Sequence, residues 1–392
     1  MVTWRVHLQI RTNLEFCDHV DKNLCQHDFY FYKLKGNKDS YKRKKLLLLA
    51  TCFISSVASI LLLYILSGQV NNRKNGFIRL YPPHVITPLK IIDLSESNYY
   101  FAGKGESKIF LAKINDPSSI FTVDYNLTDT HTYSIKLPVK PRLIQANISV
   151  SVIPPHFFIT QGSAHLIMRG NLSDYTINHI DSSFSFDQAI PVSLNSLIIR
   201  TYDRQRKQNI LGKIYMDPPK FIRSVNNLIK QQDGIFSTDG MINYDDNTRS
   251  IIYIYFYRNS ILSLDSSLNL IATYKTIDTT SQAKIGLAYL SDSSLTMNKP
   301  PHFVNKQCYT ANGLIFVHSV LKANNEETEI FDKSTTIDVY NVKTGLYKLS
   351  FYIPKYLGMK ITSFIVADTN IFVLYDHFLF SYHLNKIPGL PY

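Results

Sequence analysis

The chain has 392 residues, of which 45% are hydrophobic, with a formal net charge of +12 and four cysteines. This composition is normal for a globular protein, so it excludes a disordered chain and a small scaffold held together by disulfides. After residue 45 the basic residues form no long block, and no nucleic-acid-binding module is recognisable. We therefore expect no nucleic-acid partner.

The first 45 residues show no sustained helical or strand periodicity. They carry ten Lys and Arg against five Asp and Glu. We expect residues 1–45 to be a disordered cytoplasmic tail. The alternative is that the start codon was assigned too far upstream, and that the native chain starts near the basic cluster Lys42-Arg43-Lys44-Lys45.

An uncharged apolar run follows, from Leu46 to Leu66. As a helix rising about 1.5 Å per residue, it spans roughly the 30 Å hydrocarbon core of a bilayer. Because the basic cluster directly precedes it, we expect a single-pass inner-membrane protein with a cytoplasmic N-terminus and a periplasmic C-terminal domain. A cleaved signal peptide is the alternative, although Leu66-Ser67-Gly68 matches a cleavage site poorly. After the membrane anchor, we expect residues 67–85 to be a linker.

Strand signals dominate residues 86–392. Short runs rich in Ile, Val, Tyr, Phe and Thr alternate with turns rich in Asn, Asp, Ser and Gly. The best helical pattern, over 219–230, is short. The sequence therefore predicts an all-β fold for this part of the chain.

The strand signals repeat as a unit of two strands separated by a few turn residues. Successive units start 40 to 63 residues apart, a spacing typical of propeller blades. Packing small sheets in a ring buries their faces and leaves no long edge exposed. We predict a six-bladed β-propeller over 86–392, with two stacked β-sandwiches as the alternative. The units start at Asn98, His156, Ser196, Ser250, Gly313 and Asn370.

The sequence contains no nucleophile elbow, zinc-protease helix, P-loop or dinucleotide-binding motif, and we expect no cofactor. Four carboxylates lie close together ahead of the fourth unit, and carboxylates at such density can bind Ca²⁺. Ordinary hairpin turns are the alternative. The candidate metal ligands are Asp233, Asp239, Asp245 and Asp246.

Three further residues carry side chains that could take part in catalysis. His156 and His377 are candidates for the funnel of a propeller, although histidines at strand ends are usually structural. Cys308 is the only cysteine after Cys52, so it has no disulfide partner within the β domain. We expect a buried, inert thiol there.

Three stretches carry a resemblance to a known group: residues 46–84, 232–240 and 251–257. Over most of 46–392 the chain resembles uncharacterised membrane-anchored proteins of Bacteroidota. This resemblance implies an envelope location. It also implies a partner of the DoxX/methylamine-utilisation type, small redox-associated membrane proteins often encoded beside such chains. It implies no catalytic residues.

Two functions follow as hypotheses. The first is a membrane-anchored extracytoplasmic binding or scaffolding protein, whose exposed loops hold another envelope protein or a peptide. The alternative is an envelope hydrolase or lyase with its active site in the propeller funnel. Carboxylates and histidines gathered at one end of the channel would favour the enzyme, whereas an apolar or aromatic patch would favour the binding protein.

Overall fold

The computed structural model describes residues 38–71, 75–114, 116–137, 147–181, 183–223, 228–292 and 294–386. The chain divides into two compact units, Met1–Arg73 and Lys74–Tyr392. Most of the expected cytoplasmic tail lies outside the described residues.

The first unit contributes one helix, α1 (Lys38–Asn71). Its apolar part, Arg43–Ile65, is 23 residues long and is not buried by any other part of the protein. A helix satisfies its own backbone hydrogen bonds, so it can cross lipid. One N-terminal apolar helix of membrane-spanning length is therefore confirmed, and its orientation stays a prediction.

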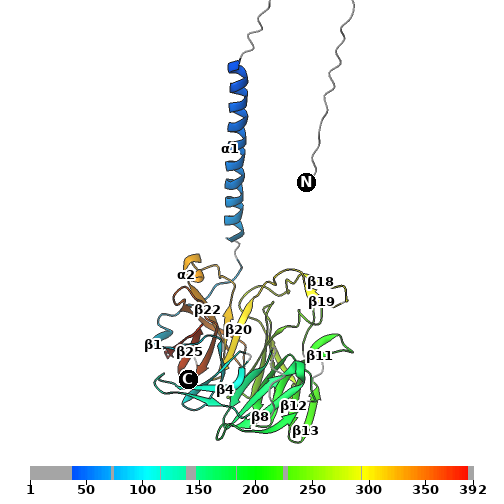
Figure 1. The fold of residues 1–392 in the computed structure, drawn as a ribbon. Helices are drawn as coiled ribbons and strands as arrows, with labels where there is room; N and C mark the ends of the chain where they lie inside the picture. The colour runs from blue at the N-terminus through cyan, green and yellow to red at the C-terminus, as the bar shows by residue number, and fades with distance from the viewer. Residues whose placement is uncertain are drawn as a thin grey trace, which may run out of the picture. The chain divides into compact units, whose positions relative to one another are not determined.

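The second unit contains β strands in sheets of four (Figure 1). Blade 1 and blade 2 join through one parallel pair, Gly103 with Val152, to give an eight-stranded sheet. Blade 1 contains β2 (Tyr99–Lys104), β3 (Lys108–Lys113), β4 (Asp116–Asp124) and β5 (Thr130–Ser134), and blade 2 contains β6 (Ser149–Ile153), β7 (His156–Gln161), β8 (Leu166–Asn171) and β9 (Ile177–Asp181).

The next three blades have the same antiparallel up-and-down order. Blade 3 contains β10 (Gln188–Ser193), β11 (Ser196–Asp203), β12 (Gln208–Met216) and β13 (Pro219–Arg223). Blade 4 contains β14 (Gly240–Asp245), β15 (Ser250–Tyr255), β16 (Ile261–Leu264) and β17 (Leu270–Tyr274). Blade 5 contains β20 (Asn305–Ala311), β21 (Leu314–Ser319), β22 (Ser334–Asn341) and β23 (Tyr347–Pro354).

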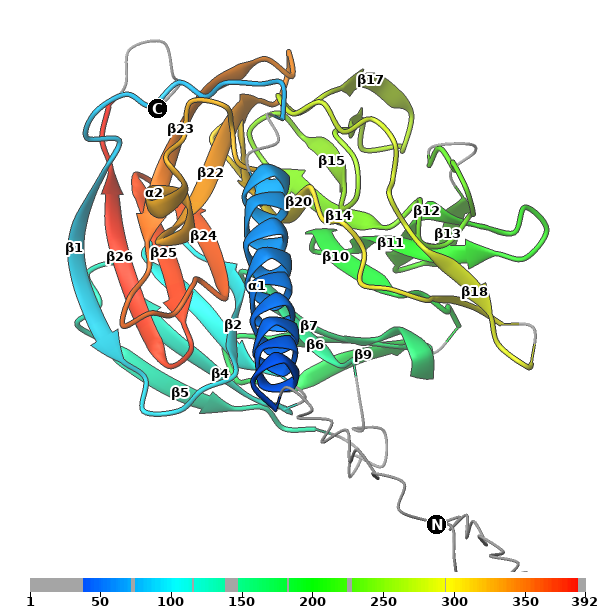
Figure 2. The same cartoon turned by 90° about the horizontal axis from the view of Figure 1, so that it is seen from above.

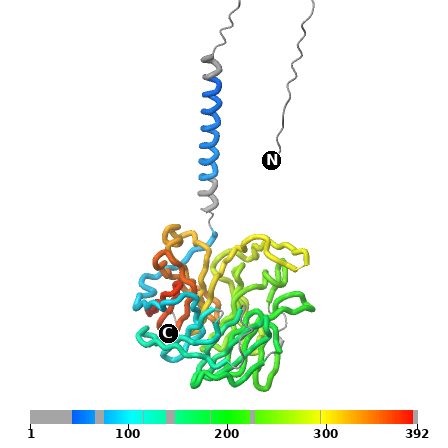
Figure 3. The backbone as a smooth tube through the Cα atoms, in the orientation of Figure 1, coloured from blue at the N-terminus to red at the C-terminus, as the bar shows by residue number. Residues whose placement is uncertain are grey.

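Blade 6 closes the ring with both ends of the unit. It contains β24 (Ser363–Ala367), β25 (Asn370–Tyr375), β26 (Phe378–Leu384) and, as its outer strand, β1 (Ile86–Asp93). The pairing of β1 with β26 runs from Ile86 opposite Leu384 to Asp93 opposite Phe378. Figure 3 shows the early blue strand beside the late red ones. This pairing ties the start of the β unit to its end.

The first strand of each blade contacts the first strands of its two neighbours, in the closed order β2, β6, β10, β14, β20, β24 and back to β2. Figure 2 shows the sheets around a common centre. The predicted six-bladed propeller is confirmed, and the stacked sandwiches are wrong. The smaller elements in the connections are η1 (Gly162–Ala164), β18 (Leu287–Tyr289), β19 (Leu295–Met297) and α2 (Thr328–Asp332).

The predicted units have the right number but are displaced by one strand in five of six blades. Only the first begins near a first strand, β2; the others begin at the second strand, as Ser250 does at β15. Every residue of β15 is buried, whereas β14 mixes buried and half-buried residues. Second strands therefore read as continuous apolar runs, and the first strands, apart from β24, do not.

Two segments differ from their sequence patterns. The short helical pattern over 219–230 is wrong for its first part, which forms β13 because it pairs with β12 from Gly212 opposite Arg223 to Met216 opposite Pro219. Part of the expected linker 67–85 packs on the blades: Phe77 is buried beside Val304 and Leu321. We call residues 75–85 the strap. The expected domain limits at 45, 66 and 85 stay a prediction.

Candidate binding site in the central channel

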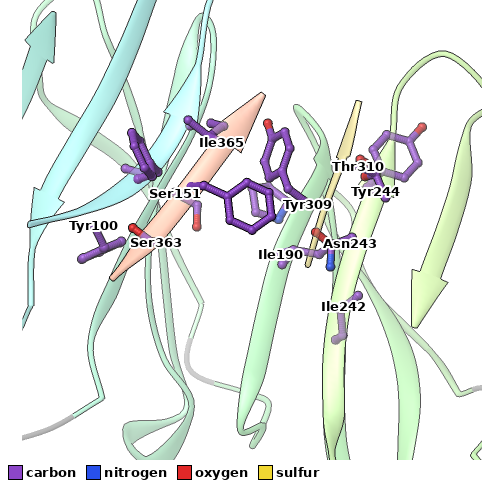
Figure 4. Close-up of a pocket in the computed structure, with 15 residues that line it drawn as sticks. Tyr100, Ser151, Ile190, Ile242, Asn243, Tyr244, Tyr309, Thr310, Ser363 and Ile365 are labelled. Carbon is purple, nitrogen blue, oxygen red and sulfur yellow. The ribbon is translucent and has the colours of Figure 1, made fainter. Parts of the chain in front are cut away.

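The first strands surround a cavity of about 310 Å³. Its lining comes from β2, β6, β10, β14, β20 and β24, so every blade contributes (Figure 4). The closed ring places these residues together, although 265 positions separate Tyr100 from Ile365 in the chain. Because ligand sites are concave and few in a protein, this channel cavity is the leading candidate site.

The cavity is lined by rings, aliphatic side chains, hydroxyls and one amide. Among the described residues that line it, none is Asp, Glu, His, Lys, Arg or Cys. The rings are those of Tyr100, Phe101, Tyr244, Tyr309 and Phe364. The site therefore offers apolar surface and neutral hydrogen-bonding groups.

The lining tyrosines remain protonated at neutral pH. Burial raises the pKa of Tyr100 to about 12. Burial also raises the pKa of Tyr244 and of Tyr309, and in both cases nearby Asp246 raises it further. Each phenol is therefore a hydrogen-bonding group near pH 7 and not a general base.

Some polar groups in the cavity are held by the protein and others are not. The Tyr100 hydroxyl donates to the Val150 carbonyl at 3.3 Å and accepts from the Val150 N–H at 2.6 Å, which ties β2 to β6. Within the described part of the chain, the buried Ser363 Oγ has no hydrogen-bond partner. A buried hydroxyl without a partner is costly, and a ligand group can satisfy it.

Charged groups gather where the first strands end. Lys104, the last residue of β2, donates from Nζ to the Val366 carbonyl at 3.1 Å. The same Nζ lies 5.7 Å from the centre of the Tyr309 ring. Burial lowers the pKa of Lys104, while the charges of Asp246, Asp245 and Asp368 oppose that shift. This end of the channel therefore holds one amine among carboxylates.

The four candidate metal ligands have separate roles. The Asp233 carboxylate accepts from backbone N–H groups of its own turn, and Asp239 pairs with Arg200. Asp245 accepts from the Thr248 N–H at 2.8 Å, and burial raises the pKa of Asp246. In the described ranges no three His, Cys, Asp or Glu side chains are grouped so as to hold a metal. The calcium site stays a prediction without geometric support.

The candidate residues His156, His377 and Cys308 do not line the channel cavity. His156 begins β7, and His377 lies in the turn before β26, where Nδ1 is 2.9 Å from Asp376. Burial raises the pKa of the Cys308 thiol, which fits the expected unreactive state.

A second cavity of about 220 Å³ lies between blades 2 and 3. Ile190 lines both this cavity and the channel cavity. Asp187, on its wall, pairs with Arg200 at 2.6 Å. The one carboxylate among the described residues lining this cavity is therefore already neutralised by the protein.

No family model matches the chain, and no curated protein matches it. Similar solved structures include a DUF4221 member from Bacteroides vulgatus, 14% identical over 76% of this chain and 97% of its own, with a TM-score of 0.49. A streptogramin B lyase is 12% identical over 76% and 98%, with a TM-score of 0.44. A gluconolactonase from Xanthomonas campestris is 8% identical over 78% and 94%, with a TM-score of 0.47.

These structures include enzymes, and the Bacteroides vulgatus protein comes from the phylum of the sequence resemblance. At these identities and TM-scores the similarities carry no argument for function. The propeller assignment rests on the closed ring of first strands.

Proposed function

We propose that this protein is a membrane-anchored binding protein that holds a small uncharged ligand in the channel of its propeller. The observation that carries the proposal is the cavity lining, which comes from all six blades and, among described residues, contains no charged side chain and no histidine. General acid–base chemistry needs a group that titrates near neutral pH within reach of the ligand. Rings and neutral polar groups serve binding instead.

The proposal includes a location. Lys42-Arg43-Lys44-Lys45 directly precedes the uncharged run from Leu46 to Leu66 within α1, which favours a cytoplasmic N-terminus and an extracytoplasmic, periplasmic propeller. Another envelope protein is the proposed partner, such as a redox-associated membrane protein of the DoxX type. The sequence resemblance supports that choice.

One observation favours the second candidate, an envelope hydrolase or lyase. Lys104 is an amine with a lowered pKa at the end of the channel, next to the Tyr309 ring. A partly desolvated lysine can act as a base or nucleophile. In that case a Lys104→Met variant would retain ligand but lose turnover.

A retention experiment tests the proposal. The full chain in lipid nanodiscs is equilibrated with a cell metabolite extract, washed and denatured, and the released molecules are identified by mass spectrometry. Ser363→Phe places a ring in the cavity, and Ser151→Phe blocks it from a different blade. Ser107→Phe, on an exposed turn, is the matched control.

We expect a neutral small molecule to be released unchanged from the wild type and from Ser107→Phe, and to be absent from both blocked variants. Thermal unfolding of each variant shows that it is folded. Equal retention by the blocked variants contradicts a channel site. Chemical conversion of the molecule by the wild type supports the enzyme.

A further inference from the structure

We propose that the channel ligand is an uncharged sugar ring, held between aromatic side chains and hydrogen-bonded through its hydroxyls. This inference rests on the proposed function and names its ligand class. Three properties of the cavity support it: the absence of charge, the combination of rings with free polar groups, and the size.

The first property is charge. An ion buried without a partner loses its hydration and regains nothing. The described lining offers no counter-charge, and the positive charge of nearby Lys104 already interacts with the carboxylates of Asp246, Asp245 and Asp368. Sugar phosphates and sugar acids are therefore disfavoured relative to the neutral sugars from which they derive.

The second property is the combination of side chains. The Asn243 amide both donates and accepts hydrogen bonds, and so does a hydroxyl such as Ser151 or Ser363. In the described structure, no hydrogen bond within the protein occupies the Asn243 amide, the Ser151 hydroxyl or the Ser363 hydroxyl. Figure 4 shows Asn243 and Tyr309 on one side of the opening and Ser363 on the other.

A sugar ring matches this arrangement on both counts. Its hydroxyls are donors and acceptors around the edge of the ring, and its C–H faces pack against aromatic rings such as those of Phe101 and Phe364. A purely apolar ligand would leave Ser363 Oγ and the Asn243 amide buried without partners, and that loss opposes its binding.

The third property is size. A volume of about 310 Å³ lies at the lower end of the roughly 300–1,000 Å³ range of small-molecule sites. It suits one ring and not an extended chain. The ring comes either from a free monosaccharide or from the terminal unit of a longer glycan.

The test is isothermal titration of the full chain in nanodiscs with defined sugars. The neutral set is glucose, galactose, mannose and N-acetylglucosamine, and the charged set is glucose 6-phosphate and glucuronate. Soluble oligosaccharides ending in each neutral unit separate the two sources. Asn243→Leu removes the amide, and Asn247→Leu, in an exposed turn, is the matched control.

We expect at least one neutral sugar, free or terminal, to bind about tenfold or more tightly than either charged sugar. Asn243→Leu should weaken that binding about tenfold, and Asn247→Leu should leave it unchanged. Binding only of oligosaccharide ends assigns the glycan source, and binding of free sugars assigns the monosaccharide; both support the inference.

Two results overturn it. Equal or tighter binding of a charged sugar contradicts the charge argument. Failure of every neutral sugar, while the retention experiment yields another neutral ligand, refutes the sugar class and leaves the proposed function standing. If the retention experiment also yields no channel ligand, the proposed function itself fails.

Discussion

At the residue scale, Arg79 holds the strap to blade 5. Its side chain is fully buried, and Nε lies 2.7 Å from Asp338 while Nη1 lies 2.5 Å from Glu326. Nη2 donates to Ser319 Oγ at 2.8 Å. Removing a buried cation from between two buried carboxylates is costly, because both carboxylates are left buried without their partner.

Replacing Arg79 with leucine should therefore lower the free energy of unfolding by about 3–5 kcal/mol. Chemical denaturation of the full chain measures the loss. Arg204→Leu, at an exposed turn, should change stability by less than about 0.5 kcal/mol. Similar losses in the two variants would mean that the Arg79 network does not hold the strap.

His318 gives a pH-dependent prediction. Burial, together with the charges of Lys306 and Lys360, lowers its pKa from 6.5 to about 3. The folded protein keeps the imidazole neutral, while the unfolded chain takes up a proton as the pH falls below 6.5. This contribution to stability is therefore complete above pH 6.5 and is lost progressively towards pH 3.

His318 alone changes the free energy of unfolding by up to about 1.4 kcal/mol per pH unit. His318→Gln should flatten the dependence of unfolding free energy on pH in that window relative to the wild type. His165→Gln, at an exposed turn, should leave the curve unchanged. Parallel curves for the wild type and His318→Gln would show that His318 is not held neutral.

None of the channel-lining residues could be identified from the sequence. Asn243 lies in β14 among Ile242 and Tyr244, a pattern that any mixed strand shows. Its position at the channel depends on closure of the whole ring, which is a long-range property. Asp233 and Asp245 were candidates only because they are carboxylates. Each accepts a hydrogen bond from a backbone N–H of its own turn, and Asp245 also accepts one from the Gly313 N–H in blade 5.

At the element scale, the pairing of β1 with β26 closes the propeller. Ile91 lies opposite Phe380 in this pair. A disulfide between cysteines at these positions would join the two ends of the β unit and restrict the unfolded chain. The geometry is suitable because directly opposed residues in an antiparallel pair lie about 4.5–5.5 Å apart at Cα.

The double variant Ile91→Cys/Phe380→Cys should therefore be about 2–4 kcal/mol more stable when oxidised than when reduced. Thermal or chemical unfolding with and without reductant measures the difference. The wild type should show no such dependence, because Cys308 is half-buried and the β unit contains no second cysteine to pair with it. Failure of the crosslink to form would contradict closure by β1.

Strand content and blade number were predictable because central strands carry continuous apolar runs. The chain order of the strands also helped, since each blade is built from consecutive strands, apart from the one completed by β1. The pairing of β1 with β26 was not predictable, because no local pattern connects residues 86–93 with 378–384. The helical pattern over 219–230 is wrong for residues 219–223, because their pairing with β12 overrode local propensity.

At the scale of the whole molecule, the basic cluster before the apolar run predicts the topology. Protease added to cells with only the outer membrane permeabilised should digest the propeller, since we place it in the periplasm. An epitope at the N-terminus should stay protected. Digestion of the C-terminal domain only after the inner membrane is opened would reverse the proposed orientation.

Binding of an uncharged ligand requires a channel that admits small neutral molecules and disfavours charged ones. Ser363→Cys places a thiol in the cavity, and Ser107→Cys places one on an exposed turn. In both variants Cys17, Cys25 and Cys52 are replaced by serine, while Cys308 remains because burial raises the pKa of its thiol. Neutral iodoacetamide and anionic iodoacetate then react with the same thiolate.

The ratio of the two alkylation rates isolates the effect of reagent charge, since the thiolate concentration cancels. We predict that iodoacetamide is favoured over iodoacetate about tenfold more at position 363 than at position 107, because the cavity cannot solvate an anion. Equal ratios at the two positions, or no reaction of either reagent at position 363, would contradict the channel site.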